Sequence, residues 1–284
     1  MQRLMQGKVV VITGATSGIG QVAAEKLGAM GARIVQVARD KMRGQAALEK
    51  LRQVAPGIAH SIHYADLSSL AQMKQVAGAI AAAEPRIDVL INNAGAMFTR
   101  RQMTVDGLER TFAVNHLAYF VLTHGLRHRL VASAPARVVN TSSDAHRSAK
   151  LDFSDLQSEK GYAGFKVYGR SKLCNILFTR ELERSLAGTG VTANCLHPGF
   201  VATRFGDQSG GMLSYGVRLA KLFAISPDKG AETIVYLASS PEAAKVSGSY
   251  FYKCRPATPT LDAQNDNAAQ RLWMESAKLA GWDA

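Results

Sequence analysis

Two side chains four residues apart could carry out acid–base chemistry. Tyr168 and Lys172 lie in a stretch that reads as a helix, where this spacing puts both on one face. A tyrosine has an ordinary pKa of about 10, and a nearby ammonium favours the phenolate and lowers that pKa. The pair could then serve as a general acid or base, and Ser143, at the end of a strand-like run, could donate a hydrogen bond to a substrate oxygen. Taken alone, the pair also fits a half-buried tyrosine beside a surface lysine.

A second stretch joins the apolar residues 9–12 to the glycines Gly14, Gly18 and Gly20. The unbroken β-branched run predicts a buried parallel strand, and residues 22–27 predict the helix that follows. Such a turn aims unpaired backbone N–H groups at one spot, where the helix dipole favours an anion. We therefore predict a pyrophosphate site. A purely structural turn is the alternative, because the Gly-x-x-x-Gly-x-Gly spacing differs from the common dinucleotide fingerprint.

The remaining chain repeats this rhythm. Strands are predicted at residues 33–38, 58–65, 87–91, 137–142, 191–196 and 249–252. Helices are predicted from a cap at 66–69 to residue 83, and at 41–54, 105–130, 165–186, 226–239 and 262–279. The alternation predicts an α/β fold with one domain, a doubly wound parallel sheet of about seven strands with helices on both faces. Ligands bind such sheets at the carboxyl ends of the strands, which makes the polar residues there candidates.

Composition excludes several function classes. The chain has 284 residues, 47% of them apolar, which is enough for a sizeable core. No apolar run approaches the roughly 20 residues that span a bilayer, and no signal-peptide pattern is visible, so we expect a cytoplasmic protein. The three cysteines form no zinc-binding pattern, so we expect no metal. The net charge of +12 comes from scattered basic residues without a nucleic-acid motif, so we expect no nucleic-acid partner.

Several motifs occur together and in order: Thr13-Gly14-x-x-x-Gly18-Ile19-Gly20, Asn92-Asn93-Ala94-Gly95, Asn115, Ser143, Tyr168-x-x-x-Lys172 and Pro198-Gly199. With this set, nearly the whole sequence resembles the classical short-chain dehydrogenase/reductase family, whose fold is of the Rossmann type. Asp106-Gly107-Leu108-Glu109, residues 151–156 and Gln270-Arg271-Leu272-Trp273 resemble its retinol-dehydrogenase-like branch.

The resemblance implies roles for single residues. Tyr168 would exchange a proton with the substrate oxygen, and Lys172 would lower the pKa of Tyr168 and hold the nicotinamide ribose. Ser143, rather than Ser142, would orient and polarise the carbonyl. Asn115 would help to hold a water chain to Lys172. The implied cofactor contacts are Gly14, Ser17, Gly18, Ile19, Gly20, Arg39, Asp66, Leu67, Asn93, Ala94, Gly95, Tyr168, Lys172, Pro198, Gly199, Val201 and Thr203. Asn92, Pro198 and Gly199 could instead be turn residues only.

The residue after the second predicted strand bears on the choice of cofactor. An acidic residue there binds the ribose 2′-hydroxyl of NAD, and an arginine suits the 2′-phosphate of NADP. This chain has Arg39 there, followed by Asp40, with further positive charge at Lys41 and Arg43. We therefore predict NADP(H).

Together these features predict an NADP(H)-dependent oxidoreductase that interconverts a ketone or aldehyde and an alcohol by hydride transfer, with Tyr168 as general acid and base. An apolar substrate is suggested by Met97, Phe98, Phe200, Phe205, Met212, Leu213 and Tyr215, which could equally be packing residues. One alternative is a non-enzymatic NADP(H)-binding sensor or interaction protein. Another is an oxidoreductase that contacts a membrane surface through the basic amphipathic residues 217–223.

Two expectations concern larger features. Residues 203–226, punctuated by glycines, could be a substrate lid or merely a surface loop and helix. The resemblance also implies a homodimer or homotetramer that pairs through the long helices carrying Asn115 and Tyr168.

Overall fold

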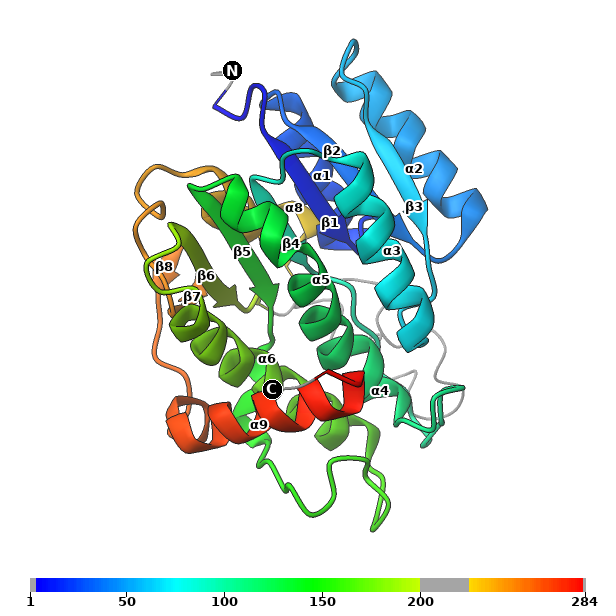
Figure 1. Cartoon of the computed structure of the whole chain (residues 1–284), viewed down its shortest axis with the longest axis vertical. Coiled ribbons are helices and arrows are strands. Elements are labelled where there is room, and N and C mark those ends of the chain that lie inside the picture. The colour runs from blue at the N-terminus through cyan, green and yellow to red at the C-terminus, as the bar shows by residue number, and fades with distance from the viewer. Residues whose placement is uncertain (1–3, 200–224, 283–284) are drawn as a thin grey trace.

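The centre of the molecule is an eight-stranded sheet in the order β3-β2-β1-β4-β5-β6-β7-β8 (Figure 1). The computed structural model describes residues 4–199 and 225–282. Neighbouring strands run parallel, except that β8 pairs antiparallel with β7. The strands are β1 (Val9–Thr13), β2 (Arg33–Ala38), β3 (Ser61–Tyr64), β4 (Val89–Asn92), β5 (Ala136–Thr141), β6 (Val191–Leu196), β7 (Tyr250–Tyr252) and β8 (Arg255–Pro256). The predicted parallel sheet is confirmed, with one short edge strand more than expected.

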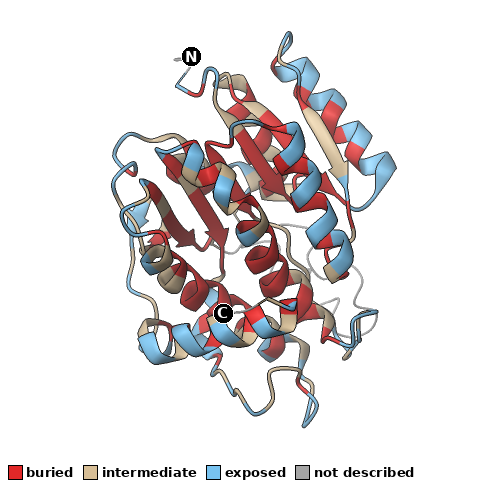
Figure 2. Ribbon diagram, in the orientation of Figure 1, coloured by how far each residue is buried: buried red, intermediate tan, exposed pale blue. Residues whose placement is uncertain are grey.

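Helices cover both faces of the sheet, and its central strands β1, β2, β4, β5 and β6 are mostly buried, whereas the edge strands β3 and β8 are not (Figure 2). One face packs on α1 (Gly18–Ala29), α2 (Lys41–Val54) and α8 (Pro227–Ser239). The other packs on α3 (Leu70–Ala83), α5 (Ala118–Ala132) and α6 (Gly164–Ser185), and α9 (Asp266–Ala280) packs against α6. Shorter helical segments are α4 (Arg110–Phe112), η1 (Ala113–Leu117), η2 (Asp144–Ser148) and η3 (Asp262–Gln264).

The helix expected over residues 105–130 begins at Arg110 instead. Residues before it form a tight turn, in which Thr104 N donates to the carbonyl of Leu108 at 2.8 Å. The carboxylate of Glu109 then accepts from the backbone N–H groups of Thr111 and Phe112, at 2.8 Å each. A side chain that satisfies the first free N–H groups fixes where a helix starts. The sequence pattern alone did not distinguish this cap from a residue within the helix.

The C-terminal helix α9 lies along α6 (Figure 1). Trp273 of α9 stacks on Phe178 of α6 with ring centroids 5.8 Å apart, and it meets Phe120 of α5 edge-on at 5.0 Å. Asp266 at the start of α9 pairs with Arg180 of α6. The expected pairing of subunits through the long helices stays a prediction, and this face of α6 is covered by the chain itself.

Candidate active site

Ser143, Tyr168 and Lys172 come together beyond the carboxyl end of β5. Ser143 follows that strand and begins η2, where its Oγ accepts from Ala145 N at 3.2 Å. Tyr168 and Lys172 share a face of α6, with Lys172 Nζ 5.5 Å from the centroid of the Tyr168 ring. The Ser143 hydroxyl hydrogen-bonds the Tyr168 phenol. The structure therefore brings the three predicted residues into one cluster.

Lys172 is a buried cation without a carboxylate partner among the described residues. Lys172 is only 2% exposed, and its Nζ donates to the main-chain carbonyl of Thr141 at 3.1 Å. Nζ also lies 5.7 Å from the ring centroid of Tyr119. Burial disfavours the charged amine and lowers the pKa of Lys172 to about 7. The amine is therefore close to half protonated at neutral pH.

The pKa of Tyr168 moves in the direction opposite to the one expected from its lysine neighbour. Burial raises it to about 12, against the smaller effect of the hydrogen bond from Ser143. The amine of Lys172 is itself only partly charged at neutral pH, so it does not outweigh the desolvation of the phenolate. Tyr168 is thus a neutral phenol, in the protonation state of a general acid.

The neighbouring Ser142 makes a different contact from Ser143. It is 1% exposed, and its Oγ donates to the main-chain carbonyl of Lys172 at 2.8 Å. Because its hydroxyl is used to fasten β5 to α6, Ser143 is the serine whose side chain faces Tyr168.

Asn115 lies in η1, a π-helical turn inside the helix that runs from Arg110 to Ala132. Its Oδ1 accepts from Ala96 N at 2.8 Å, and its Nδ2 donates to Ala96 O and to Ser171 Oγ, at 2.9 Å each. A Cβ placed on Gly95 would lie 3.2 Å from Lys172 Nζ and 3.4 Å from Asn115 Oδ1. Asn115 therefore fixes the segment after β4 against α6, beside the amine of Lys172.

The glycine turn after β1 is locked onto the end of β4. Thr13 Oγ1 accepts from the backbone N–H groups of Asn93 and Ala94, at 3.0 Å each. Asn93 Nδ2 in turn donates to the carbonyls of Thr13 and Gly14, at 3.2 Å each. A Cβ on Gly20 would lie 2.3 Å from both Gly14 O and Asn93 Nδ2. The side chain of Asn93, expected to line a cofactor, thus holds the turn in shape.

This turn presents the features that a pyrophosphate needs. Gly14 and Gly18 have φ angles of 68° and 58°, in the left-handed region that favours glycine. The first N–H groups of α1 lack partners within the helix, as at any helix start. Ser17 at the N-cap is exposed, and its hydroxyl makes no capping bond within the described chain. The residues present therefore fit a bound dinucleotide.

At the end of β2, Arg39 and Asp40 have separate environments. The Asp40 carboxylate caps α2 by accepting from Arg43 N at 2.8 Å. Arg39 is exposed and is close enough to Asp66 to lower the pKa of that carboxyl. Burial acts on Asp66 in the opposite direction, but hydrogen bonds from Ser68 lower its pKa as well. Arg39 is thus the side chain that this strand end offers to a ligand.

The other predicted cofactor contacts lie in different parts of the molecule. Ala94 and Gly95 lie between the glycine turn and Lys172, whereas Leu67 packs into the hydrophobic core. Gly199, with φ of 86°, donates from its N–H to His197 Nδ1 at 3.3 Å. The expected contacts Val201 and Thr203, the apolar residues from 200 to 215, the amphipathic residues 217–223 and most of the expected lid lie outside the described residues.

A family model for short chain dehydrogenases matches residues 8–212, a span that includes the glycine turn, Ser143, Tyr168 and Lys172. The chain belongs to the short-chain dehydrogenase family. Retinol dehydrogenase 12 from Mus musculus is 42% identical over 275 residues, which cover 97% of this chain and 87% of that relative. This similarity confirms the retinol-dehydrogenase-like branch. In the described ranges, this dehydrogenase has no helix long and apolar enough to cross a membrane and no group of three metal-binding side chains.

Solved structures agree with this assignment. An uncharacterised protein from Mycobacterium paratuberculosis superposes with a TM-score of 0.77 at 31% identity, covering 98% of this chain and 95% of its own. A short-chain dehydrogenase from Burkholderia cenocepacia, solved in complex with NADP, superposes with a TM-score of 0.69 at 26% identity, covering 87% of this chain and 96% of its own.

Three residues that hold the catalytic cluster of this dehydrogenase together were not predicted from the sequence: Thr141, Ser171 and Asn175. The carbonyl of Thr141 accepts from Lys172 Nζ and from Asn175 Nδ2, at 3.1 and 3.2 Å. Ser171 links Asn115 to the main chain of Tyr168. A main-chain acceptor leaves no signal in residue identity, so Thr141 could not have been found by pattern. Ser171 lies three residues after Tyr168, and Asn175 lies three residues after Lys172. On a helix this spacing places side chains next to one another, so it could have identified both residues.

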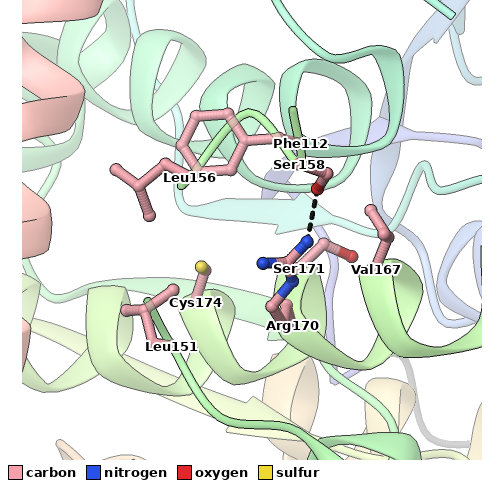
Figure 3. Close-up of a pocket in the computed structure, with 8 residues that line it drawn as sticks. All are labelled: Phe112, Leu151, Leu156, Ser158, Val167, Arg170, Ser171 and Cys174. Carbon is pink, nitrogen blue, oxygen red and sulfur yellow. Dashed lines mark hydrogen bonds between the residues drawn. The ribbon is translucent and has the colours of Figure 1, made fainter. Parts of the chain in front are cut away.

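A small pocket lies on another side of α6 (Figure 3). It is lined by Phe112, Leu151, Leu156, Ser158, Val167, Arg170, Ser171 and Cys174. Arg170 hydrogen-bonds Ser158 across it, and burial raises the pKa of the Cys174 thiol to about 12, which makes the thiol unreactive. By helical spacing Val167, Arg170 and Cys174 lie on a different side of α6 from Tyr168 and Lys172, and Ser171, which bonds Asn115, lies between the two sides.

Proposed function

We propose that this short-chain dehydrogenase is an NADP(H)-dependent oxidoreductase that interconverts an apolar aldehyde or ketone and the corresponding alcohol. The observation that carries the proposal is the cluster of Ser143, Tyr168 and Lys172, in which the Ser143 hydroxyl meets a protonated phenol. Two hydroxyl groups that hydrogen-bond one another can both turn towards one substrate oxygen. That oxygen becomes negative as a carbonyl is reduced, so donors preorganised around it lower the barrier.

The chain's own residues divide the work of proton transfer. Ser143 donates a hydrogen bond that orients the substrate oxygen, and Tyr168 gives that oxygen its proton. Lys172, held in place by the Thr141 carbonyl, stabilises the phenolate that remains. Asn115 positions Lys172 and Tyr168 through its bonds to Ala96 and Ser171. A bound nicotinamide supplies or accepts the hydride. A protonated phenol is the form that can give a proton to the oxygen of a carbonyl substrate.

Tyr168→Phe tests this function. The variant removes only the hydroxyl group, so carbonyl reduction should fall by about 100- to 10,000-fold, the range of general acid–base catalysis. Binding of NADPH, followed by fluorescence, should remain detectable, because the glycine turn and Arg39 are unaltered. The alternative of a non-enzymatic sensor predicts tight NADPH binding by the wild-type protein and no turnover of any aldehyde, ketone or alcohol. Full activity of Tyr168→Phe would remove this residue from the mechanism.

The preference for NADP(H) is supported by the end of β2. The carboxylate of Asp40 caps α2, whereas the side chain of Arg39 is exposed and does not cap a helix. An arginine at this place suits the 2′-phosphate of NADP. The Burkholderia cenocepacia relative, which was solved with NADP, is a further reason to expect the phosphorylated cofactor.

Arg39→Ala should weaken NADPH binding by about 10- to 100-fold, the worth of a hydrogen bond to a charged group, and should leave NADH binding nearly unchanged. Arg52→Ala is the matched control, because Arg52 lies in the last turn of α2 and pairs with Glu49. It should leave both affinities unchanged. An equal or greater catalytic efficiency of the wild type with NADH would contradict the proposed preference.

The substrate class is proposed from the branch and from the described surroundings of the site. The relative in Mus musculus is named a retinol dehydrogenase, and the apolar residues Met97 and Phe98 directly follow Ala96, whose N–H and carbonyl bond Asn115. We therefore expect retinal and medium-chain aldehydes to be reduced with higher kcat/KM than sugar aldehydes. A panel of these carbonyls with NADPH, and of the alcohols with NADP, measures this. A preference for the polar aldehydes would refute the apolar site.

A further inference from the structure

We propose that His146 is a positioning residue for Ser143: its neutral imidazole, with the proton on Nδ1, connects the serine's main chain to the segment that leads into the C-terminal helix. The inference rests on the proposed function, in which the Ser143 hydroxyl orients the substrate oxygen. His146 lies in η2, is fully buried and has no part in proton transfer in the mechanism above.

Both ring nitrogens of His146 have partners of defined chemistry. Nδ1 lies 2.8 Å from the carbonyl oxygen of Ser143, which can only accept, so Nδ1 carries a proton. Nε2 lies 3.4 Å from the backbone N of Thr260, which can only donate, so Nε2 carries none. Burial also lowers the pKa of His146, which agrees with a neutral ring. The two partners therefore select one tautomer.

These contacts restrain the peptide that carries the catalytic hydroxyl. The Ser143 carbonyl accepts from the imidazole at 2.8 Å and from the backbone N of His146 at 3.2 Å. On the other side, the Ser143 Oγ accepts from Ala145 N at 3.2 Å. With the main chain held at its carbonyl, the hydroxyl keeps its direction towards Tyr168. A displacement of about 1 Å at such a group can cost about 100-fold in rate.

The far side of His146 is supported by residues distant in the sequence. Tyr250 of β7 meets the imidazole edge-on, with ring centroids 5.2 Å apart. Thr260 lies between β8 and η3, and a second bond ties this segment to η2, from the guanidinium of Arg147 to the Thr258 carbonyl at 3.0 Å. His146 thus transmits the position of the C-terminal segment to Ser143.

Two substitutions separate the two contacts. The amide nitrogen of His146→Asn can take the place of Nδ1 and keep the bond to Ser143, whereas the amide oxygen of His146→Gln can take the place of Nε2 and keep the bond to Thr260. We expect His146→Asn to retain kcat within a few-fold and His146→Gln to lose about 100-fold. NADPH affinity should stay unchanged in both, because neither substitution touches the glycine turn.

Other outcomes would overturn the proposal. A loss of more than tenfold in kcat for His146→Asn would show that keeping the Ser143 contact is not enough to position the serine, and full activity of His146→Gln would show that this contact does not matter. Nitrogen-15 NMR of the wild-type imidazole should show protonated Nδ1 and unprotonated Nε2 at neutral pH, and the reverse tautomer or a charged ring would contradict the geometry. If the wild type reduced no carbonyl at all, the proposed function would fail separately. Crystal structures of both variants would then decide the positioning role, since Ser143 Oγ should shift in His146→Gln only.

Discussion

The glycine turn and the catalytic cluster meet at one edge of the sheet, yet they are built by different means. The turn is made of backbone: two glycines with positive φ, a helix start, and amide and hydroxyl groups of Asn93 and Thr13 that fasten it to β4. The cluster is made of side chains: the buried amine of Lys172, which donates to the carbonyl of Thr141, and the half-buried phenol of Tyr168, which hydrogen-bonds Ser143.

This difference separates how each region can fail. The turn tolerates no added atoms, because the glycines are packed against backbone that cannot move away. The cluster can lose atoms without a clash, but it holds Lys172 in a state that burial disfavours. We therefore expect substitutions in the turn to damage binding and stability together. Substitutions in the cluster should separate activity from stability.

The largest effect is expected for Gly20→Ala. The new Cβ would lie 2.3 Å from the carbonyl oxygen of Gly14, so the turn must shift. We expect the free energy of unfolding to fall by about 3 kcal/mol, at the upper end for overpacking, and NADPH binding to become undetectable. Chemical denaturation and fluorescence titration measure the two. A variant with normal stability and affinity would show that the turn is less rigid than its packing implies.

Lys172→Met should separate the two properties of the cluster. Loss of the amine should reduce turnover by at least about 100-fold. Removal of an amine whose pKa falls from 10.5 to about 7 on folding should at the same time raise the free energy of unfolding of the cofactor-free protein by about 4 kcal/mol at pH 7, less the lost bond to Thr141. Denaturation and steady-state kinetics on the same preparation test both parts. If the variant were both less active and less stable, Lys172 would be needed for stability as well as activity, as we expect for the glycine turn.

The same residue predicts how stability depends on pH. The pKa of Lys172 falls from 10.5 to about 7 on folding, so between these values the unfolded chain binds a proton that the folded chain does not. Stability of the wild type should therefore rise with pH from about 7 upwards. From about pH 8 the raised pKa values of the Cys174 and Cys195 thiols act in the opposite direction, and above pH 10 so does the raised pKa of Tyr168, so the lysine is isolated by the difference between the wild type and Lys172→Met. In Lys172→Met the slope between pH 7 and 9 should be smaller than in the wild type by up to about 1.4 kcal/mol per pH unit.

The sequence predicted the parallel sheet and many of its elements, but it predicted the details of the site less completely, and the reasons are physical. Apolar periodicity located α2 and β2 at their observed bounds, because burial on one or both faces dictates residue type at every position. It missed the start at Arg110, the π-turn around Asn115 and β8. Those features depend on single hydrogen bonds or on two-residue pairings, which periodicity does not register.

In the site, residue identity predicted which side chains gather but not their protonation. The spacing of Tyr168 and Lys172 on a helix was sufficient to place them on one face. The raised pKa of Tyr168 depends on burial by surrounding elements, which no local pattern contains. Likewise, no local pattern indicated that the Asn93 side chain bonds the backbone of the glycine turn, and its contact with a cofactor stays a prediction.

A smaller effect is expected for Asn115→Ala. It leaves the N–H and carbonyl of Ala96 without their side-chain partner, which should cost about 2 kcal/mol of folding stability. Turnover should fall less than in Lys172→Met, because the proton-transferring groups remain. Ser171→Ala is the matched control, since it removes only one of the bonds that Asn115 makes. If both variants lost equal stability, the bonds to Ala96 would contribute little, and the link to α6 would be the main role of Asn115.

The smallest effect, with the opposite sign, is expected for Gly78→Ala. Gly78 lies on the exposed side of α3, and no atom comes within 4 Å of the position its Cβ would take. Alanine there should raise the free energy of unfolding by about 0.5 to 1 kcal/mol, because it favours the helix and restricts the unfolded chain. Gly125→Ala on α5 is the contrast, since its Cβ would lie 2.7 Å from the Cβ of Ala77. Thermal denaturation should move the two variants in opposite directions. If Gly78→Ala were destabilising, an added Cβ would cost stability even where there is room for it. The loss of stability in Gly20→Ala could then not be ascribed to the packing of the turn alone.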